Sequence, residues 1–377
     1  MSRDMTFAFI RAVRAGMLMA TLLGLLGCAP PDPVRLGFVG GLSGRVADLG
    51  LNGRDGALLA VELRNKAGGV KGRRVELLTE DDQQDPDVAR QAVTRLIERK
   101  VQAIIGPMTS AMAMATVALV DQAQIPMVSP TVTTNDLTGL DDYFFRVLSP
   151  TRNFAAKSAN FHFQRAGVRR VAAVYDLGNK AYTESWLADY RTAFTAAGGR
   201  LVASISFTSS GETHFAELAR QLLKTNADGI VIIANSVDAA MLCQQLRKLN
   251  ASIPIAAAEW SATELLIELG GRAVEGIVIA QFLDRQSTQP TYVEFRRNYL
   301  ARFRKEPGFA GLTAFDATNV ILEGLEHQLP GQSLKQTLTT RKTFGGAQSP
   351  VVLDAFGDTS RETHLATIKD GSFVALP

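Results

Sequence analysis

The chain of 377 residues has few of the side chains that build metal, redox or nucleophilic sites. It contains two cysteines and four histidines, and none of them follows a metal-binding spacing such as C-x-x-C or H-E-x-x-H. It also has no G-x-S-x-G nucleophile turn and no G-x-x-x-x-G-K-[S/T] phosphate loop. We therefore predict no metal, no cofactor and no enzymatic activity.

The chain also has little net charge. Its formal charge is +3, and residues 1–27 contribute +2 of that, so the remainder carries only +1. Proteins that bind nucleic acid or an anionic membrane surface through charge are usually far more basic. We predict no nucleic-acid partner.

Near the N-terminus lies an apolar run that is too short to cross a membrane. Three arginines flank a 13-residue apolar stretch, whereas a transmembrane helix needs ~20 residues. The stretch leads into Leu-Leu-Gly-Cys at Cys28, which resembles a bacterial lipobox. We predict a lipoprotein signal peptide over residues 1–27, lipidation of Cys28 and a proline-rich tether over residues 28–33. A simple secretory signal with an incidental cysteine is the alternative.

The second cysteine, Cys243, has no disulfide partner within the chain if Cys28 carries a lipid. It falls in a stretch with a helical pattern, AAMLCQQL. We predict that it is a small buried side chain.

From Val34 onward, short β-rich runs alternate with amphipathic helical stretches, and the pattern restarts midway along the chain. One helix is expected from Asn52, and Asp85-Pro86 marks the start of another. After Phe282 come two long helical stretches and two terminal strand segments, with a hairpin turn at Asp370-Gly371. The alternation predicts two doubly wound α/β units with mainly parallel sheets.

Polar side chains recur where the predicted strands end, which is the edge at which open α/β sheets bind ligands. They come from both units and comprise Ser110, Thr131, Thr133, Tyr182, Ser236 and Glu259. Hydroxyls and a helix N-terminus suit a carboxylate, whereas Glu259 and threonine oxygens suit an ammonium group. The set predicts a site for a small zwitterion. Ordinary helix capping and turn formation are the alternative for each residue.

Several stretches together resemble the leucine/isoleucine/valine-binding protein family, the type I periplasmic binding proteins that serve ABC importers. They include GFVGGLSGRVADLG, AIIGPMTSAMA, IPMVSPTVTTNDLT and VAAVYD. The resemblance runs from Val34 to the closing VVLDAFGD and implies two lobes, joined by three hinge crossings, that close on a ligand without catalysis. The lobes are expected to be residues 34–148 plus 282–345 and residues 149–281 plus 346–377.

The resemblance also implies roles for single residues. Ser110 matches the serine that binds the ligand carboxylate, and Thr131 matches a position whose backbone contacts the ligand. Thr133 matches a threonine that contacts both the carboxylate and the amine. Tyr182 matches a tyrosine of the second lobe, and Glu259 matches the acid that pairs with the α-ammonium group. We expect Ser110 to cap its helix when the site is empty.

Three positions depart from the family pattern. Leu49 and Ser236 stand where branched-chain binders have aromatic residues, and Trp260 stands where a glycine is usual. We expect recognition of the amino-acid end groups to be kept while the side-chain pocket is altered.

The residues and the resemblance together predict a monomeric, lipid-anchored, extracytoplasmic solute-binding protein. It would capture an amino acid, branched-chain or analogous, for an ABC permease. One alternative is a protein of the same fold that binds amides, aromatic acids or other organic acids for transport or sensing. Another is a regulatory envelope lipoprotein that binds no solute.

Overall fold

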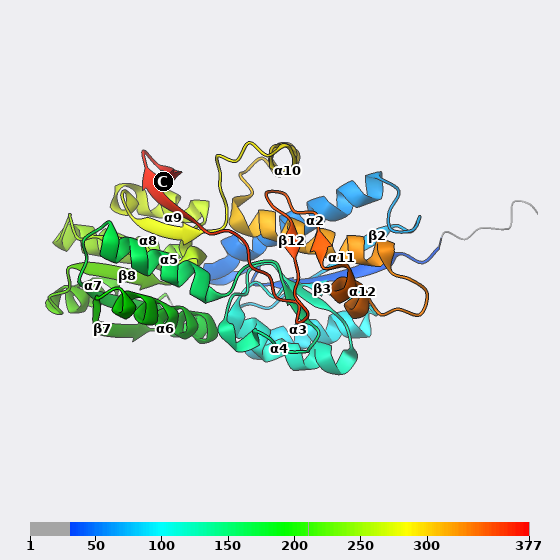
Figure 1. The fold of residues 1–377 in the computed structure, drawn as a ribbon, viewed down its shortest axis with the longest axis horizontal. Helices are drawn as coiled ribbons and strands as arrows, with labels where there is room; N and C mark the ends of the chain where they lie inside the picture. Colours follow the sequence, from blue (N-terminus) through cyan, green and yellow to red (C-terminus); the bar gives the residue numbers. More distant parts are fainter. Residues whose placement is uncertain (1–30, 210, 377) are drawn as a thin grey trace, which may run out of the picture.

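A computed structural model describes residues 31–209 and 211–376, which form two α/β bodies side by side along the long axis of the molecule (Figure 1). The predicted signal peptide and Cys28 lie outside the described residues. Within the described part of the chain, no helix is long and apolar enough to span a membrane. The same residues contain no group of histidine, cysteine and acidic side chains that could hold a metal ion.

The first lobe is built on a five-stranded, fully parallel sheet in the order β2-β1-β3-β4-β5. Its strands are β1 (Val34–Gly40), β2 (Val75–Asp81), β3 (Ala103–Ile105), β4 (Met127–Ser129) and β5 (Phe144–Arg146). The last three are buried along their whole length, as expected for parallel strands covered on both faces. The helices of this lobe are α2 (Ala47–Lys66), α3 (Pro86–Glu98), α4 (Ser110–Ala123), α10 (Pro290–Phe303), α11 (Gly308–His327) and α12 (Leu334–Arg341).

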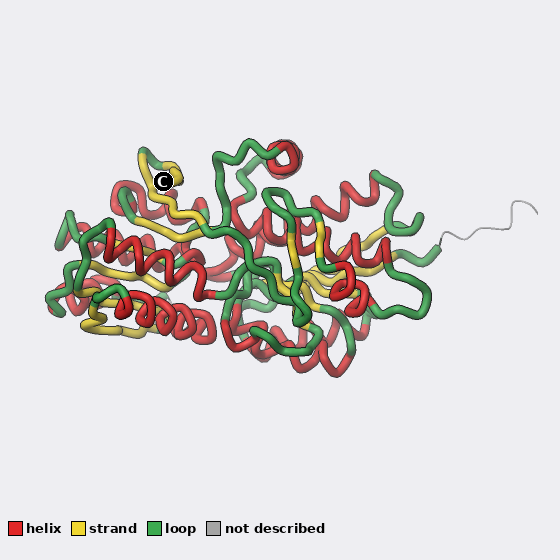
Figure 2. The backbone as a smooth tube through the Cα atoms, in the orientation of Figure 1, coloured by secondary structure: helices red, strands yellow, loops and turns green. Residues whose placement is uncertain are grey.

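The second lobe contains a seven-stranded sheet in the order β14-β13-β10-β9-β8-β6-β7. Its parallel strands are β6 (Arg170–Asp176), β7 (Arg200–Phe207), β8 (Gly229–Ile233), β9 (Ile255–Ala257) and β10 (Val278–Gln281). Its helices are α5 (Thr151–Gln164), α6 (Lys180–Ala196), α7 (Phe215–Lys224), α8 (Ser236–Leu249) and α9 (Glu264–Gly270). Figure 2 shows helices flanking the strands in both lobes.

An antiparallel hairpin closes the edge of the second sheet. It consists of β13 (His364–Lys369) and β14 (Ser372–Leu376), joined at Asp370 and Gly371. Both turn residues have positive φ, as a two-residue hairpin turn requires. The predicted hairpin turn is therefore confirmed.

The chain passes between the two lobes three times. It crosses between β5 and α5, between β10 and α10, and between β12 (Val351–Val352) and β13. β12 pairs with β11 (Thr343–Phe344) in a small sheet of its own. The predicted fold class is confirmed, with two lobes of mainly parallel sheet.

Helices α2 and α11 pack together closely through glycine in the first lobe. A Cβ atom placed on Gly56 would lie 2.0 Å from the carbonyl oxygen of Gly311. Only glycine permits this approach of the two backbones. The contact joins a helix from the beginning of the lobe to one that returns after the second crossing, so the two segments form one body.

One helix boundary differs from the sequence prediction. Helix α2 begins at Ala47 rather than at Asn52, because Leu49 is buried and extends the apolar side of the helix by a turn. The earlier start places Asp48 and Leu49 in the first turn, at the cleft between the lobes. Cys243 is free and buried, as predicted.

Candidate functional site

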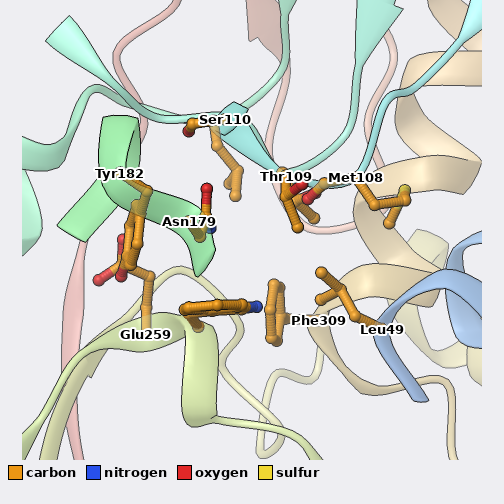
Figure 3. A pocket seen from close by; sticks show the side chains of 11 residues that line it. Leu49, Met108, Thr109, Ser110, Asn179, Tyr182, Glu259 and Phe309 are labelled. Carbon is orange, nitrogen blue, oxygen red and sulfur yellow. The ribbon is translucent and has the colours of Figure 1, made fainter. Parts of the chain in front are cut away.

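A cavity lies between the lobes, beyond the carboxyl ends of strands from both sheets (Figure 3). Its empty space, counted together with the solvent at its mouth, is about 300 Å³. The lining residues are Leu49, Met108, Thr109, Ser110, Thr131, Leu148, Asn179, Tyr182, Glu259, Trp260 and Phe309. The cavity is therefore apolar on one side and has hydroxyl, amide and carboxyl groups on the other.

Six of the eight residues predicted for ligand recognition line this cavity, and two do not. Thr133 is fully buried behind the lining, and its Oγ1 has no hydrogen-bond partner. Ser236 instead donates a hydrogen bond from Oγ to Oδ2 of Asp48, at 2.7 Å. Its hydroxyl thus contacts the opposite lobe, and the cavity lining does not include it.

The segment that follows β3 brings hydroxyl groups to the start of α4. Thr109 is the extended residue before the helix, but its Oγ1 donates to Oε1 of Gln84 at 3.0 Å and makes no cap hydrogen bond. Ser110 is the first helical residue, and its Oγ accepts from the backbone N–H of Thr134 at 3.4 Å. The expectation that Ser110 caps this helix is wrong, because a cap residue must precede the helix in an extended conformation.

A side chain of the second lobe accepts a hydrogen bond from one N–H group at the start of α4. Asn179 ends a short 3₁₀ helix, Leu177–Asn179, and its Oδ1 accepts from the backbone N–H of Ala111 at 3.0 Å. Thr131 uses its hydroxyl to donate to the carbonyl oxygen of Met108 at 2.5 Å. Its backbone is therefore the part that is left to meet a ligand.

Glu259 follows strand β9 and is a buried acid, with only 6% of its surface exposed. Its Oε2 accepts from Nε1 of Trp186 at 2.8 Å, and the hydroxyl of Tyr182 lies against the same carboxyl group. Burial raises the pKa of Glu259 from 4.5 to about 7, even though the contacts with Trp186 and Tyr182 lower it. Within the described residues it forms no salt bridge, so a positive partner would be strongly favoured here.

Helix α6 places two aromatic residues one turn apart against this acid. Tyr182 and Trp186 are at positions i and i+4, which share one face of a helix. The edge of the Tyr182 ring meets Trp260 with 5.7 Å between ring centroids. Burial raises the pKa of the Tyr182 phenol well above its usual range, and the neighbouring Glu259 carboxyl group raises it further.

Glu259 and Tyr182 thus face each other at the cavity wall, and within the described residues the carboxyl group has no positively charged partner. A buried carboxylate is costly unless a positive group or several hydrogen bonds compensate its charge. Such a wall is typical of a site that a positively charged ligand group completes.

The two lobes are closed on the cavity by direct polar contacts. Oδ2 of Asp48, on α2, accepts hydrogen bonds from Ser236 and from Thr263, the latter at 2.6 Å. Arg45, also in the first lobe, forms an ion pair with the buried Asp238 of α8. These contacts lie beside the cavity and join the rims of the cleft.

Sequence reasoning did not assign five of the lining residues to the site. Thr109 stands beside Ser110 at a strand end, whereas Asn179 comes after the short turn that follows β6. Met108 and Leu148 are apolar residues among many and carry no such signal. Phe309 comes from α11, which follows no strand of either sheet, so only the tertiary fold brings it to the cavity.

Two doubly wound lobes that enclose a partly polar cavity define a protein that binds a small molecule by surrounding it. The chain matches the family model described as periplasmic binding protein over residues 33–372, and it belongs to that family. The family consists of extracytoplasmic solute-binding proteins rather than enzymes. The chain is thus a periplasmic solute-binding protein of the ABC-transporter type, and the resemblance found in the sequence is confirmed.

Individual relatives agree with this family. The Leu/Ile/Val-binding protein BraC3 of Rhizobium johnstonii is 26% identical over 348 residues, which cover 91% of this chain and 93% of the relative. A leucine-binding protein from Thermotoga maritima superposes with a TM-score of 0.84 at 25% identity, covering 91% of this chain and 98% of that one. A solute-binding protein from R. palustris, solved with benzoate, has a TM-score of 0.82 at 19% identity and covers 92% and 96%; this likeness shows the fold alone.

Proposed function

We propose that the protein binds an amino acid in the cavity and presents it to an ABC permease. The observation that carries the proposal is the buried carboxyl group of Glu259, which lines the cavity and forms no ion pair within the described residues. An α-ammonium group would supply three donors and a positive charge. The hydroxyl of Tyr182, which lies against the same carboxyl group at the cavity wall, would be a further polar partner.

The opposite side of the cavity would hold the ligand carboxylate. The N-terminus of α4 carries a partial positive charge, and Ser110 opens this helix with a hydroxyl at the cavity wall. The backbone of Thr131 completes this side. The apolar lining, which includes Leu49, Trp260 and Phe309, would contact the ligand side chain.

Hinge closure would accompany binding. Residues 34–148 plus 282–352 would move as one lobe, and residues 149–281 plus 364–376 would move as the other. The predicted boundary at residue 345 is too early, because β12 pairs with β11 before the chain crosses for the third time. Capture is proposed to take place at the outer side of a membrane, where a lipid on Cys28 would hold the monomer near its permease.

An aromatic or other organic acid is the second candidate ligand. The apolar lining by Leu49, Met108 and Leu148 favours it, and the fold neighbour from R. palustris was solved with benzoate. A simple organic acid would bring no positive charge to Glu259. Glu259 would then remain without a positive partner, or it would be protonated.

A thermal-shift screen on purified protein, unfolded and refolded to remove bound ligand, would test the proposal. The panel would contain all amino acids, their amides and a set of aromatic acids. A ligand at 100 times its Kd adds ~2.7 kcal/mol, enough to raise the Tm by a few degrees. We expect shifts with one class of amino acids, their loss in Glu259→Gln and their retention in Glu268→Gln, which alters an exposed acid of α9.

Shifts with aromatic acids that persist in Glu259→Gln would refute the amino-acid proposal and support the second candidate. If no member of the panel shifted the Tm of folded protein, a regulatory role without a solute would be favoured.

A further inference from the structure

We propose that Asn179 binds the ligand carboxylate through its side-chain NH₂ group while its carbonyl oxygen accepts from the start of α4. One side chain would then contact the ligand and also connect the two lobes. This assignment rests on the proposed amino-acid function and adds a specificity-determining residue to it. Neither the strand-end pattern nor the family resemblance pointed to this position.

The orientation of the Asn179 amide is determined by its partner. Its Oδ1 lies 3.0 Å from the backbone nitrogen of Ala111, and a backbone N–H needs an acceptor. The oxygen must therefore face α4, which leaves Nδ2 and its two hydrogens for other partners. Within the described residues nothing accepts from Nδ2, although Asn179 is only 2% exposed and lines the cavity. Figure 3 shows the oxygen of the Asn179 amide on the side of Ser110 and its nitrogen on the opposite side.

The position of Asn179 is held by the turn that precedes it. Oδ1 of Asp176, at the end of β6, accepts from the backbone N–H of Gly178 at 2.8 Å and from that of Ser209 at 2.9 Å. Asp176 is itself buried. The short 3₁₀ helix that ends in Asn179 is thus fixed to the second lobe, and its side chain reaches the first lobe from a rigid base.

A carboxylate in the cavity would complete this arrangement. It would accept one hydrogen bond from Nδ2 of Asn179 and one from the hydroxyl of Ser110, which already accepts from Thr134 and has its proton free for another partner. The ligand would then bridge the lobes beside the existing bond between Asn179 and Ala111. An uncharged amide in the same place would gain less from the donors and from the helix N-terminus.

Asn179→Asp separates the two functions of the side chain. The aspartate keeps an acceptor for the N–H of Ala111. The partial positive charge at the start of α4 favours a negatively charged acceptor there. It replaces the NH₂ donor with a second oxygen that repels a carboxylate. Leu177→Asp is the matched control, because it places the same charge on the same 3₁₀ helix at an exposed side chain that does not line the cavity.

The experiment measures Kd by calorimetry for alanine, leucine, alaninamide and leucinamide. We expect the ratio of amino-acid Kd to amide Kd to rise roughly 100-fold in Asn179→Asp, since like charges in close contact cost several kcal/mol, and to stay unchanged in Leu177→Asp. An unchanged ratio, whether both ligand types bind more weakly or neither does, would overturn the role of Asn179 but not the proposed function. Wild-type protein that binds no amino acid of the thermal-shift panel would overturn the proposed function as well.

Discussion

Replacing Glu259 with glutamine should stabilise the ligand-free protein while it removes the proposed ammonium site. The carboxyl group is buried without an ion-pair partner among the described residues, and burial raises its pKa from 4.5 to about 7. A folded state with the higher carboxyl pKa binds more protons than the unfolded chain, so stability falls as pH rises from 4.5 to 7. Each pKa unit corresponds to ~1.4 kcal/mol, so the full penalty is about 3 kcal/mol above pH 7. Glutamine is never charged and still offers Trp186 an acceptor.

Urea unfolding of ligand-stripped wild type and Glu259→Gln at pH 5 and pH 8 would measure this penalty. We expect the variant to be more stable by about 3 kcal/mol at pH 8 and by less than about 1 kcal/mol at pH 5, where the folded wild type is largely protonated. Glu268→Gln, at an exposed position of α9, should change the free energy of unfolding by no more than ~0.5 kcal/mol at either pH. A difference between wild type and Glu259→Gln that does not grow with pH would refute the reasoning that Glu259 is an uncompensated buried acid.

The remaining predictions concern ligand affinity, lobe closure and helix packing. Because only ionised Glu259 attracts an ammonium group, the Kd for an amino acid should rise roughly 20-fold between pH 7.5 and pH 5.5 in calorimetric titrations, and a flat profile would contradict this. Asp48→Ala removes the acceptor shared by Ser236 and Thr263, so small-angle scattering of the ligand-free protein should show a larger radius of gyration than wild type. Gly56→Ala should lower the free energy of unfolding by at least ~2 kcal/mol because its Cβ would overlap a backbone oxygen of α11, and a Tm within one degree of wild type would contradict the close packing.

Local signals in the sequence explain why the fold could be predicted. Asp85 and Pro86 begin α3 as expected, since the Asp85 carboxylate accepts from the N–H groups of residues 87 and 88. The start of α2 was missed because Asp48 and Leu49 precede two glycines in a stretch that resembles a loop. Their helical conformation depends on burial against the rest of the molecule, which local propensity does not encode.

The site was predictable wherever polar residues follow strands. Tyr182 and Glu259 were found because they stand at strand ends, and parallel strands bring such ends together. Ser236 satisfied the same criterion but bonds to Asp48, a residue 188 positions earlier. Which strand-end hydroxyls face the cavity and which join the lobes depends on how the two lobes meet, and periodicity within one lobe carries no information about that.

The most direct test of the account is the affinity of the ligand-stripped protein for leucine or alanine compared with the same acid lacking its ammonium group. Calorimetry on 4-methylpentanoate and propanoate beside the two amino acids would give this comparison. The buried carboxyl group of Glu259, which has no positive partner among the described residues, predicts that an amino acid binds at least ~100-fold more tightly than its deaminated analogue. Equal affinity, or a preference for the deaminated acid, would contradict the claim that this buried carboxylate recognises an α-ammonium group.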